Sequence, residues 1–126
     1  MRKDWSYKRG DIYLANLEPH LGSEQGGTRP VLVLQNNVGN YFSTTLIVAL
    51  LTGKISKKKN LPTHYHLENI KALADGSTVQ LEQITTIDKQ RISYYLGKAE
   101  KEQMRDIDDV IQKSLGIYIP EEMEAP

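Results

Sequence analysis

Short apolar runs separated by turn-forming residues are the feature that most restricts the fold of this chain. Such runs occupy 11–17, 31–35, 44–52, 63–67, 77–84 and 92–96. Each has the length of a strand, and the first alternates apolar and polar residues as a half-buried strand does. A helix is the competing prediction for 44–52, but β-branched residues at its start and a Thr-Gly ending favour a strand. Asn36-Asn37 and Gly39-Asn40 predict a turn or loop.

Only the C-terminal stretch has helical periodicity. Its apolar face consists of Met104, Ile107, Val110, Ile111 and Leu115. Gly116 and Pro120 are placed to end this helix. Because 126 residues suffice for one hydrophobic core, we expect a single domain over 1–126, with its core at about 9–117 and a flexible tail over 118–126. Many short strands and one terminal helix predict a mainly β fold with α: a small, curled antiparallel barrel.

Composition limits the compartment and the chemistry. The chain contains no cysteine, which excludes disulfides and cysteine-based zinc sites and suits a reducing compartment. The N-terminus lacks the apolar segment of a signal peptide, and no window approaches the roughly twenty apolar residues that cross a bilayer. We therefore expect a cytoplasmic protein with no membrane partner.

The charge is polarised along the chain although the formal net charge is zero. Residues 1–60 carry nine Lys/Arg and four Asp/Glu, whereas residues 61–126 carry seven Lys/Arg and twelve Asp/Glu. The basic half includes a cluster of Lys54, Lys57, Lys58 and Lys59. This distribution could guide a polyanion to one face, or the unlike charges could intermix on the folded surface.

The segment 22–35, GSEQGGTRPVLVLQ, places Arg29 between a glycine-rich loop and an apolar strand. Pro30 favours an extended conformation at Arg29, and a guanidinium at the rim of a sheet can grip a phosphate. If the strands 31–35 and 44–52 pair antiparallel, the start of the first strand lies near the end of the second. Arg29, just before the first strand, would then lie near Thr52 at the end of the second. An arginine and a hydroxyl there could polarise a phosphodiester. The alternatives are a surface salt bridge for Arg29 and an ordinary strand-end threonine at Thr52.

Further polar residues flank this segment. Polar groups that could contact base edges of unpaired RNA are offered by Glu24, Gln25, Asn36, Glu82 and Gln83, although taken alone these residues are better explained as solvated loop polarity. His64 and His66 would face one side of a strand as two metal ligands might. No third ligand is evident by spacing, so we predict no metal site.

Five ordered blocks carry a resemblance to a known family. They are RGDIY, GSEQGGTRPVLVLQN, the strand ending in Thr52, LPTH, and LEQ followed by TIDKQR. Together they run from about Arg9 to Leu115 and resemble the MazF/PemK (Kid) family of toxin endoribonucleases, most closely its Gram-positive MazF branch. The resemblance implies an SH3-like β-barrel (CcdB/Kid/MazF-like) with a C-terminal helix.

The resemblance also implies a function. The chain would be the toxin of a type II toxin-antitoxin system: a homodimer that cleaves single-stranded RNA, including mRNA, at short sequence motifs. Cleavage would need neither a metal nor a cofactor, would leave 2′,3′-cyclic phosphate and 5′-hydroxyl ends, and would inhibit translation and growth. The partner would be an acidic MazE-like antitoxin, through which the toxin would touch DNA only indirectly.

By the same resemblance Arg29 and Thr52 match the family's catalytic arginine and threonine. Arg29 would act in proton transfer and stabilise the charged phosphorane, while Thr52 would fix the phosphate. The residues matching RNA-binding positions are Ser23, Glu24, Gln25, Asn36, His64 and Gln83.

The chain also departs from its relatives. Close relatives often carry arginine where Thr85 stands, so one cationic RNA contact would be missing. The Kid branch has histidine, arginine and aspartate where Ser23, Gln80 and Glu82 stand, so an Asp-based acid/base mechanism is not expected here. Two other functions remain open: a CcdB-like, non-enzymatic gyrase poison, and an SH3-like binding module.

Overall fold

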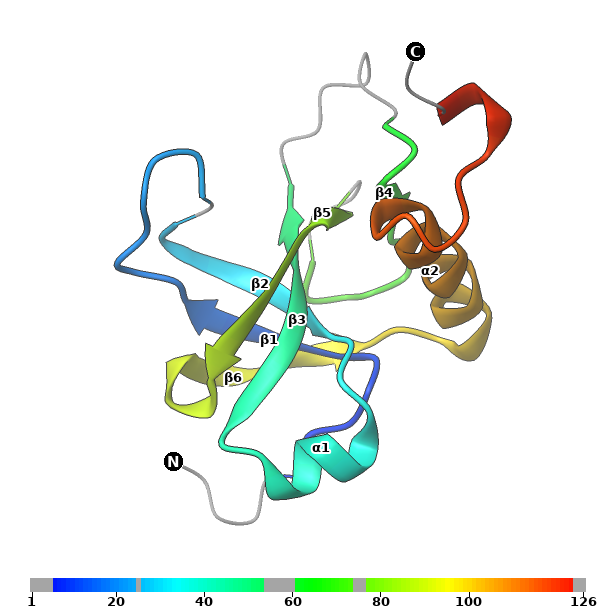
Figure 1. The fold of residues 1–126 in the computed structure, drawn as a ribbon. Helices are drawn as coiled ribbons and strands as arrows, with labels where there is room; N and C mark the ends of the chain where they lie inside the picture. The colour runs from blue at the N-terminus through cyan, green and yellow to red at the C-terminus, as the bar shows by residue number, and fades with distance from the viewer. Residues whose placement is uncertain (1–5, 25, 54–60, 74–76, 124–126) are drawn as a thin grey trace.

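The computed structural model describes residues 6–24, 26–53, 61–73 and 77–123. All strand pairs are antiparallel and form one six-stranded sheet in the order β4-β5-β3-β2-β1-β6 (Figure 1). The elements are β1 (Asp11–Asn16), β2 (Thr28–Val33), α1 (Asn37–Phe42), β3 (Thr45–Thr52), β4 (His64–His66), β5 (Thr78–Asp88), β6 (Ile92–Lys98) and α2 (Lys101–Ser114), with 3₁₀ turns at Lys89–Arg91 and Glu121–Met123. β4 and β6 form the two edges, so the sheet curls without closing. The predicted mainly β architecture with a C-terminal helix is confirmed.

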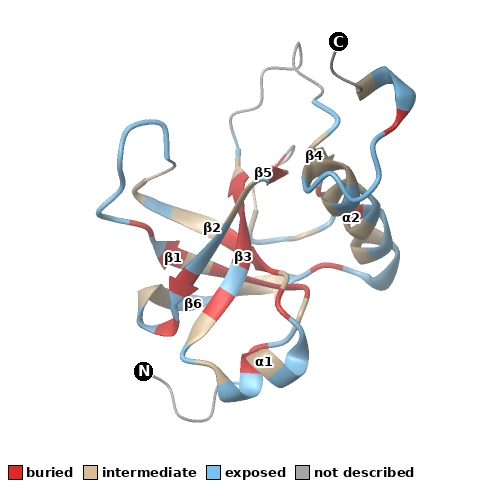
Figure 2. Cartoon of the chain, viewed as in Figure 1, coloured by how far each residue is buried: buried red, intermediate tan, exposed pale blue. Residues whose placement is uncertain are grey.

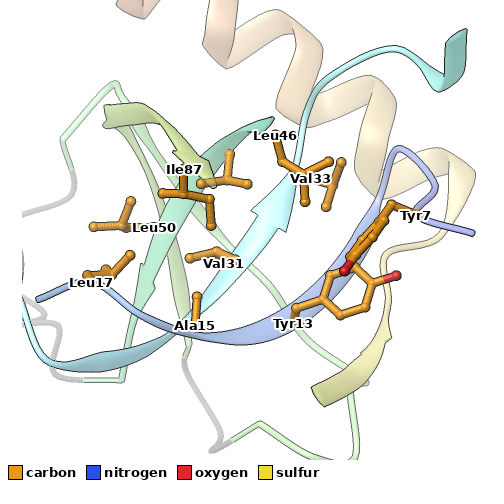
Figure 3. Packing of buried hydrophobic residues seen from close by; sticks show 10 residues of the cluster. Tyr7, Tyr13, Ala15, Leu17, Val31, Val33, Leu46, Leu50 and Ile87 are labelled. Atoms are coloured by element: carbon orange, nitrogen blue, oxygen red, sulfur yellow. The ribbon is translucent and has the colours of Figure 1, made fainter. Parts of the chain in front are cut away.

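The two faces of the sheet are buried differently. One face, with Leu32, Leu51 and Val79, packs against Ile107 of α2, which is fully buried. The other face carries a second cluster that includes Tyr13, Val31 and Leu50, drawn in Figure 3. Because successive side chains of a strand alternate between faces, each central strand contributes to both clusters. The red segments of Figure 2 accordingly concentrate on the central strands.

The turn predicted at Asn36-Asn37 and Gly39-Asn40 is wrong, because a short helix, α1, begins at Asn37. Asn36 is its N-cap and accepts a hydrogen bond from the Gly39 amide at 2.8 Å. One local and one long-range bond hold the helix in place: buried Asn40 donates to the Gln35 carbonyl at 2.9 Å, and the ammonium of the distant Lys89 donates to the Asn40 carbonyl at 2.6 Å. Asparagine therefore acts here as a cap and as a core anchor.

Element boundaries shift slightly from the predictions. The largest difference is in β2, which begins at Thr28 and so includes Arg29 within the strand. Pro30 pairs with Leu14 of β1, whereas the ladder with β3 begins only at Val31, so the missing proline amide leaves no gap on that side. Predictions for Gln25 and for the lysine cluster at 54–59 fall on residues outside the described ranges. Within the described part of the chain, no helix is long and apolar enough to cross a membrane.

Candidate active site

The register of the central strands bears on the predicted proximity of Arg29 and Thr52. β2 and β3 pair Val31 with Leu50, and the same antiparallel register extended by two residues places Arg29 across from Thr52. Arg29 shares the face of Val31, and Thr52 that of Leu50, since residues two apart along a strand point the same way. The proximity predicted from the strand ends is consistent with this register and stays a prediction.

The same line of residues continues toward the sheet edge. Thr52 pairs with Thr78 of β5, and Thr78 pairs with His66 of β4. We call Arg29, Thr52, Thr78 and His66 the catalytic row, because it contains the two residues predicted to be catalytic, Arg29 and Thr52. The intervening residues Leu51, Val79 and Leu67 belong to the cluster under α2, so the catalytic row faces away from that helix.

Arg29 is half-buried, and one side of its guanidinium is fixed. Its Nε donates to the Gly26 carbonyl at 2.8 Å, which orients the side chain along the β1–β2 loop. Among the described residues, no carboxylate lies within ion-pair distance of Arg29. The salt-bridge alternative thus has no partner in the described ranges, and the terminal nitrogens can contact an anion.

A second row of residues lies beside the first. It runs Val31, Leu50, Gln80 and His64 across β2, β3, β5 and β4. His64 has a side chain only 7% exposed, and its Nε2 lies 2.8 Å from Glu82 Oε2. Thr63 donates to the other carboxylate oxygen at 3.0 Å. This carboxylate holds the imidazole in one orientation.

Two buried polar atoms of this second row have no hydrogen-bond partner among the residues that the structure describes: His64 Nδ1 and Gln80 Oε1. Unsatisfied buried polar atoms are rare in folded proteins and cost free energy. Their residues are directly opposite one another on β4 and β5, so their side chains share one face. This part of the face is therefore suited to a ligand that supplies hydrogen-bond donors.

A cavity of about 310 Å³ opens on the same face, between the β1–β2 loop and β5. Glu24 lines it from the loop, and Glu82, Gln83 and Thr85 line it from β5, with Arg91 at one side. Thr85, where the family resemblance predicts that a cationic RNA contact is missing, lies in the cavity wall. Arg29 and Thr52 are not part of its lining, so the cavity is adjacent to the catalytic row.

The β1–β2 loop is held by a carboxylate that the sequence did not single out. Glu18 accepts hydrogen bonds from the Gly27 amide and lies 2.9 Å from His20 Nδ1. The contact with His20, followed by the bond from Gly27, keeps the pKa of Glu18 below its usual value. Arg91 also donates to the carbonyls of Asn16 and Glu18, which ties the loop base to the end of β5.

The remaining predicted RNA contacts are dispersed. Ser23 and Glu24 lie in the exposed loop, where Glu24 Oε1 accepts from the Leu21 amide at 2.6 Å. Asn36 lies beyond the C-terminal end of β2, whereas Arg29 lies near its start, and the Asn36 side chain caps α1. In the described part of the chain, no group of three His, Cys, Asp or Glu could hold a metal ion.

Known proteins are similar to this chain in sequence and in fold. The family model for the PemK-like, MazF-like toxin of type II toxin-antitoxin systems matches residues 8–115. The chain belongs to this family. The curated endoribonuclease MazF of Staphylococcus saprophyticus is 46% identical over 112 residues, covering 88% of this chain and 92% of that protein.

Solved structures support the fold independently. MazF from Deinococcus radiodurans superposes with a TM-score of 0.77 at 24% identity, covering 90% of this chain and 99% of that one. A mycobacterial endoribonuclease in complex with its cognate antitoxin superposes at 0.75, with 24% identity and the same shares of the two chains. The family and the fold expected from the five sequence blocks are both confirmed.

Sequence reasoning missed Thr78 and Gln80 as members of this face and treated His66 only as a possible metal ligand. A signal was present, because Thr78 and Gln80 alternate with the apolar Val79 and Leu81. Such alternation marks a strand with one polar face. Only the register of β4, β5 and β3 reveals that this polar face continues from Thr52.

Proposed function

We propose that this chain is the toxin of a type II toxin-antitoxin system and cleaves single-stranded RNA in a sequence-specific reaction that requires no metal. The products are a 2′,3′-cyclic phosphate and a 5′-hydroxyl, and cleavage of mRNA inhibits translation and growth. The observation that supports the proposal is the antiparallel β2–β3 register, which, continued two residues beyond Val31 and Leu50, would bring Arg29 across from Thr52. Among the described residues, no carboxylate lies within ion-pair distance of Arg29.

The chemistry follows from these two side chains. A neighbouring 2′-hydroxyl attacks the phosphorus, and negative charge builds on the non-bridging oxygens. The terminal nitrogens of Arg29 stabilise that charge, while the Thr52 hydroxyl holds the phosphate in line for attack. Arginine remains protonated at neutral pH, so its main contribution is electrostatic rather than proton abstraction.

RNA binding is assigned to the face around this pair. The cavity lined by Glu24 and Gln83 accommodates an unpaired base or sugar, and Ser23 lies in the same loop. His64 offers an acceptor at its unpartnered Nδ1. Gln25 and Asn36 complete the proposed set, Gln25 on the ground of family resemblance alone.

We also propose a homodimer. The short helix α1 exposes Val38, Tyr41 and Phe42, and the last two are 78% and 76% accessible. Adjacent aromatic side chains of this size seldom remain solvent-exposed on a monomer. Light scattering should give twice the chain mass, and Phe42→Glu should reduce it to one chain.

The proposed second partner is an acidic antitoxin, and the proposed compartment is the cytoplasm. Solved relatives include a Deinococcus radiodurans MazE-MazF complex, which superposes with a TM-score of 0.73 at 23% identity. An acidic, disordered segment is chemically suited to compete with RNA for the Arg29 side of the sheet. DNA contact would then arise only through the antitoxin.

The test is digestion of a long defined RNA in EDTA, with mapping of 5′ ends and analysis of 3′ termini. We expect cleavage at one short motif with cyclic phosphate ends, and a loss of about 10³-fold in rate for Arg29→Ala. Arg105→Ala, an exposed change on α2, is the matched control and should cleave normally. Intact RNA together with inhibition of gyrase would instead establish a CcdB-like poison.

A further inference from the structure

We propose that His66 is a catalytic residue of this active site: the general acid that protonates the departing 5′-oxygen. This inference rests on the proposed RNA cleavage and adds a group to it. It starts from the register, which places His66 in the catalytic row with Thr52 and Arg29.

The geometry of His66 suits this role. The residue lies two strands from Thr52, about 10 Å at the usual strand spacing, on the same face of the sheet. A phosphodiester gripped by Thr52 can therefore extend its 5′ side toward β4. His66 is solvent-exposed, so a bound nucleotide can reach its ring, whereas His64 on the same strand has a nearly buried side chain engaged with Glu82.

One ring nitrogen of His66 is already positioned. Its Nδ1 lies 2.8 Å from the Thr78 hydroxyl, which is fully buried and therefore rigid. With Nδ1 at Thr78, Nε2 is the ring nitrogen farther from Thr78, and we assign the proton transfer to it. Thr78 is in this sense a positioning residue, and His66 is the group that contacts the substrate.

The reaction needs such a group. Departure of the 5′-oxygen as a free alkoxide is slow, and neither a guanidinium nor an aliphatic hydroxyl is an effective general acid. Histidine is the side chain whose ordinary pKa lies closest to neutrality, and general acid catalysis contributes about 10²- to 10⁴-fold. Among the residues of the catalytic row, only His66 meets this requirement.

One bond to phosphorus forms and one breaks in this step. The 2′-oxygen forms a bond to phosphorus and loses its proton to solvent water. The bond from phosphorus to the 5′-oxygen breaks, its electron pair remains on that oxygen, and protonated His66 transfers the Nε2 proton to it. The products are the cyclic phosphate, the 5′-hydroxyl and neutral His66, which regains a proton from solvent.

A substrate with sulfur in place of the scissile 5′-oxygen tests this directly, because a thiolate leaves without protonation. The rates of wild type and His66→Ala are compared on the oxygen and sulfur versions of one RNA containing the mapped cleavage motif. We expect His66→Ala to be about 10²-fold slower or worse on the oxygen substrate and close to wild type on the sulfur substrate. Added imidazole should restore part of the lost rate. Tyr65→Phe, one residue away on the opposite face, is the matched control and should behave as wild type on both substrates.

The outcomes separate this inference from the proposed function. No RNA cleavage by the wild type would overturn the proposed function itself. Normal cleavage of the oxygen substrate by His66→Ala would overturn only the role of His66. An equal defect on both substrates would reject the general-acid assignment. Thr78→Val should lower kcat without changing affinity for a 2′-deoxy analogue, and Thr78→Ser should restore kcat; failure of that restoration would remove Thr78 from the positioning role.

Discussion

The two faces of this sheet have different roles, although residues adjacent in sequence on the same strands contribute to both. Leu51, Val79 and Leu67 lie in one cluster beneath α2, whereas Thr52, Thr78 and His66, each adjacent in sequence to one of them, form the catalytic row. Burial under a helix favours apolar side chains, whereas the other face, beyond its own buried cluster, carries polar ones at this end of the sheet. Stability and chemistry are thus separated by the two-residue period of the strand.

The largest effect on the α2 face is expected from its deepest contact. Ile107→Ala should lower the free energy of unfolding by about 2–5 kcal/mol, because Ile107 is fully buried against the sheet. Urea denaturation measures this change. Asp109→Ala, an exposed change on the same helix, should stay within about 0.5 kcal/mol. Equal losses of unfolding free energy from the two substitutions would contradict this comparison, because α2 would then not cover a hydrophobic core.

A smaller loss of stability is expected from removing the hydrogen bonds that Arg9 makes just before β1. Arg9 Nε donates to the Leu34 carbonyl at 2.8 Å, and its Nη2 lies 2.5 Å from Asp108 of α2. Both side chains are partly exposed, so solvent screening weakens the ion pair and the backbone bond contributes most of the energy. Arg9→Ala should reduce stability by about 1–2 kcal/mol in thermal or urea unfolding. Asp108→Asn should cost less, and a larger loss from Asp108→Asn would reverse this ranking.

These elements also indicate how far sequence reasoning reaches. The strands and α2 follow from local apolar periodicity, and Arg29 was identified because its glycine-rich loop and following strand are contiguous. The helix α1 could not be foreseen, because Asn40 is held by Lys89, 49 residues away. The catalytic row depends on pairings between β3, β4 and β5 and on a bulge between Ala49 and Leu50, none of which local patterns specify.

On the open face, replacing a buried polar residue should cost little stability. Gln80 leaves its Oε1 unpartnered, so Gln80→Leu removes an unsatisfied group and fills similar space. The free energy of unfolding should change by no more than about 1 kcal/mol, while the mapped cleavage motif should change. On the helix-covered face the reverse change, Leu81→Gln, should cost several-fold more. A large loss from Gln80→Leu would mean that its carbonyl is needed for folding.

The smallest effect concerns the β1–β2 loop and depends on pH. The lowered pKa of Glu18 means that its charged form is favoured in the fold, so its contribution is present above its unfolded pKa. That contribution disappears as pH falls through the lowered, folded pKa. Amide hydrogen exchange at Gly27, corrected for intrinsic rates, should show protection decreasing over that acid range. Glu18→Gln should abolish the pH dependence, and its persistence would assign the effect to another group.

Residues adjacent in sequence contribute either to stability or to catalysis, and the pair Leu51 and Thr52 tests this most directly. Both lie at the end of β3, one under α2 and one in the catalytic row. The measurement is the free energy of unfolding and the RNA cleavage rate of each variant under conditions where it is folded. The account predicts that Leu51→Ala loses about 2–5 kcal/mol of stability and keeps its rate. Thr52→Val should keep its stability within about 1 kcal/mol and lose about 10²-fold in rate. A Thr52→Val variant that cleaves normally, or a stable but inactive Leu51→Ala, would contradict the account.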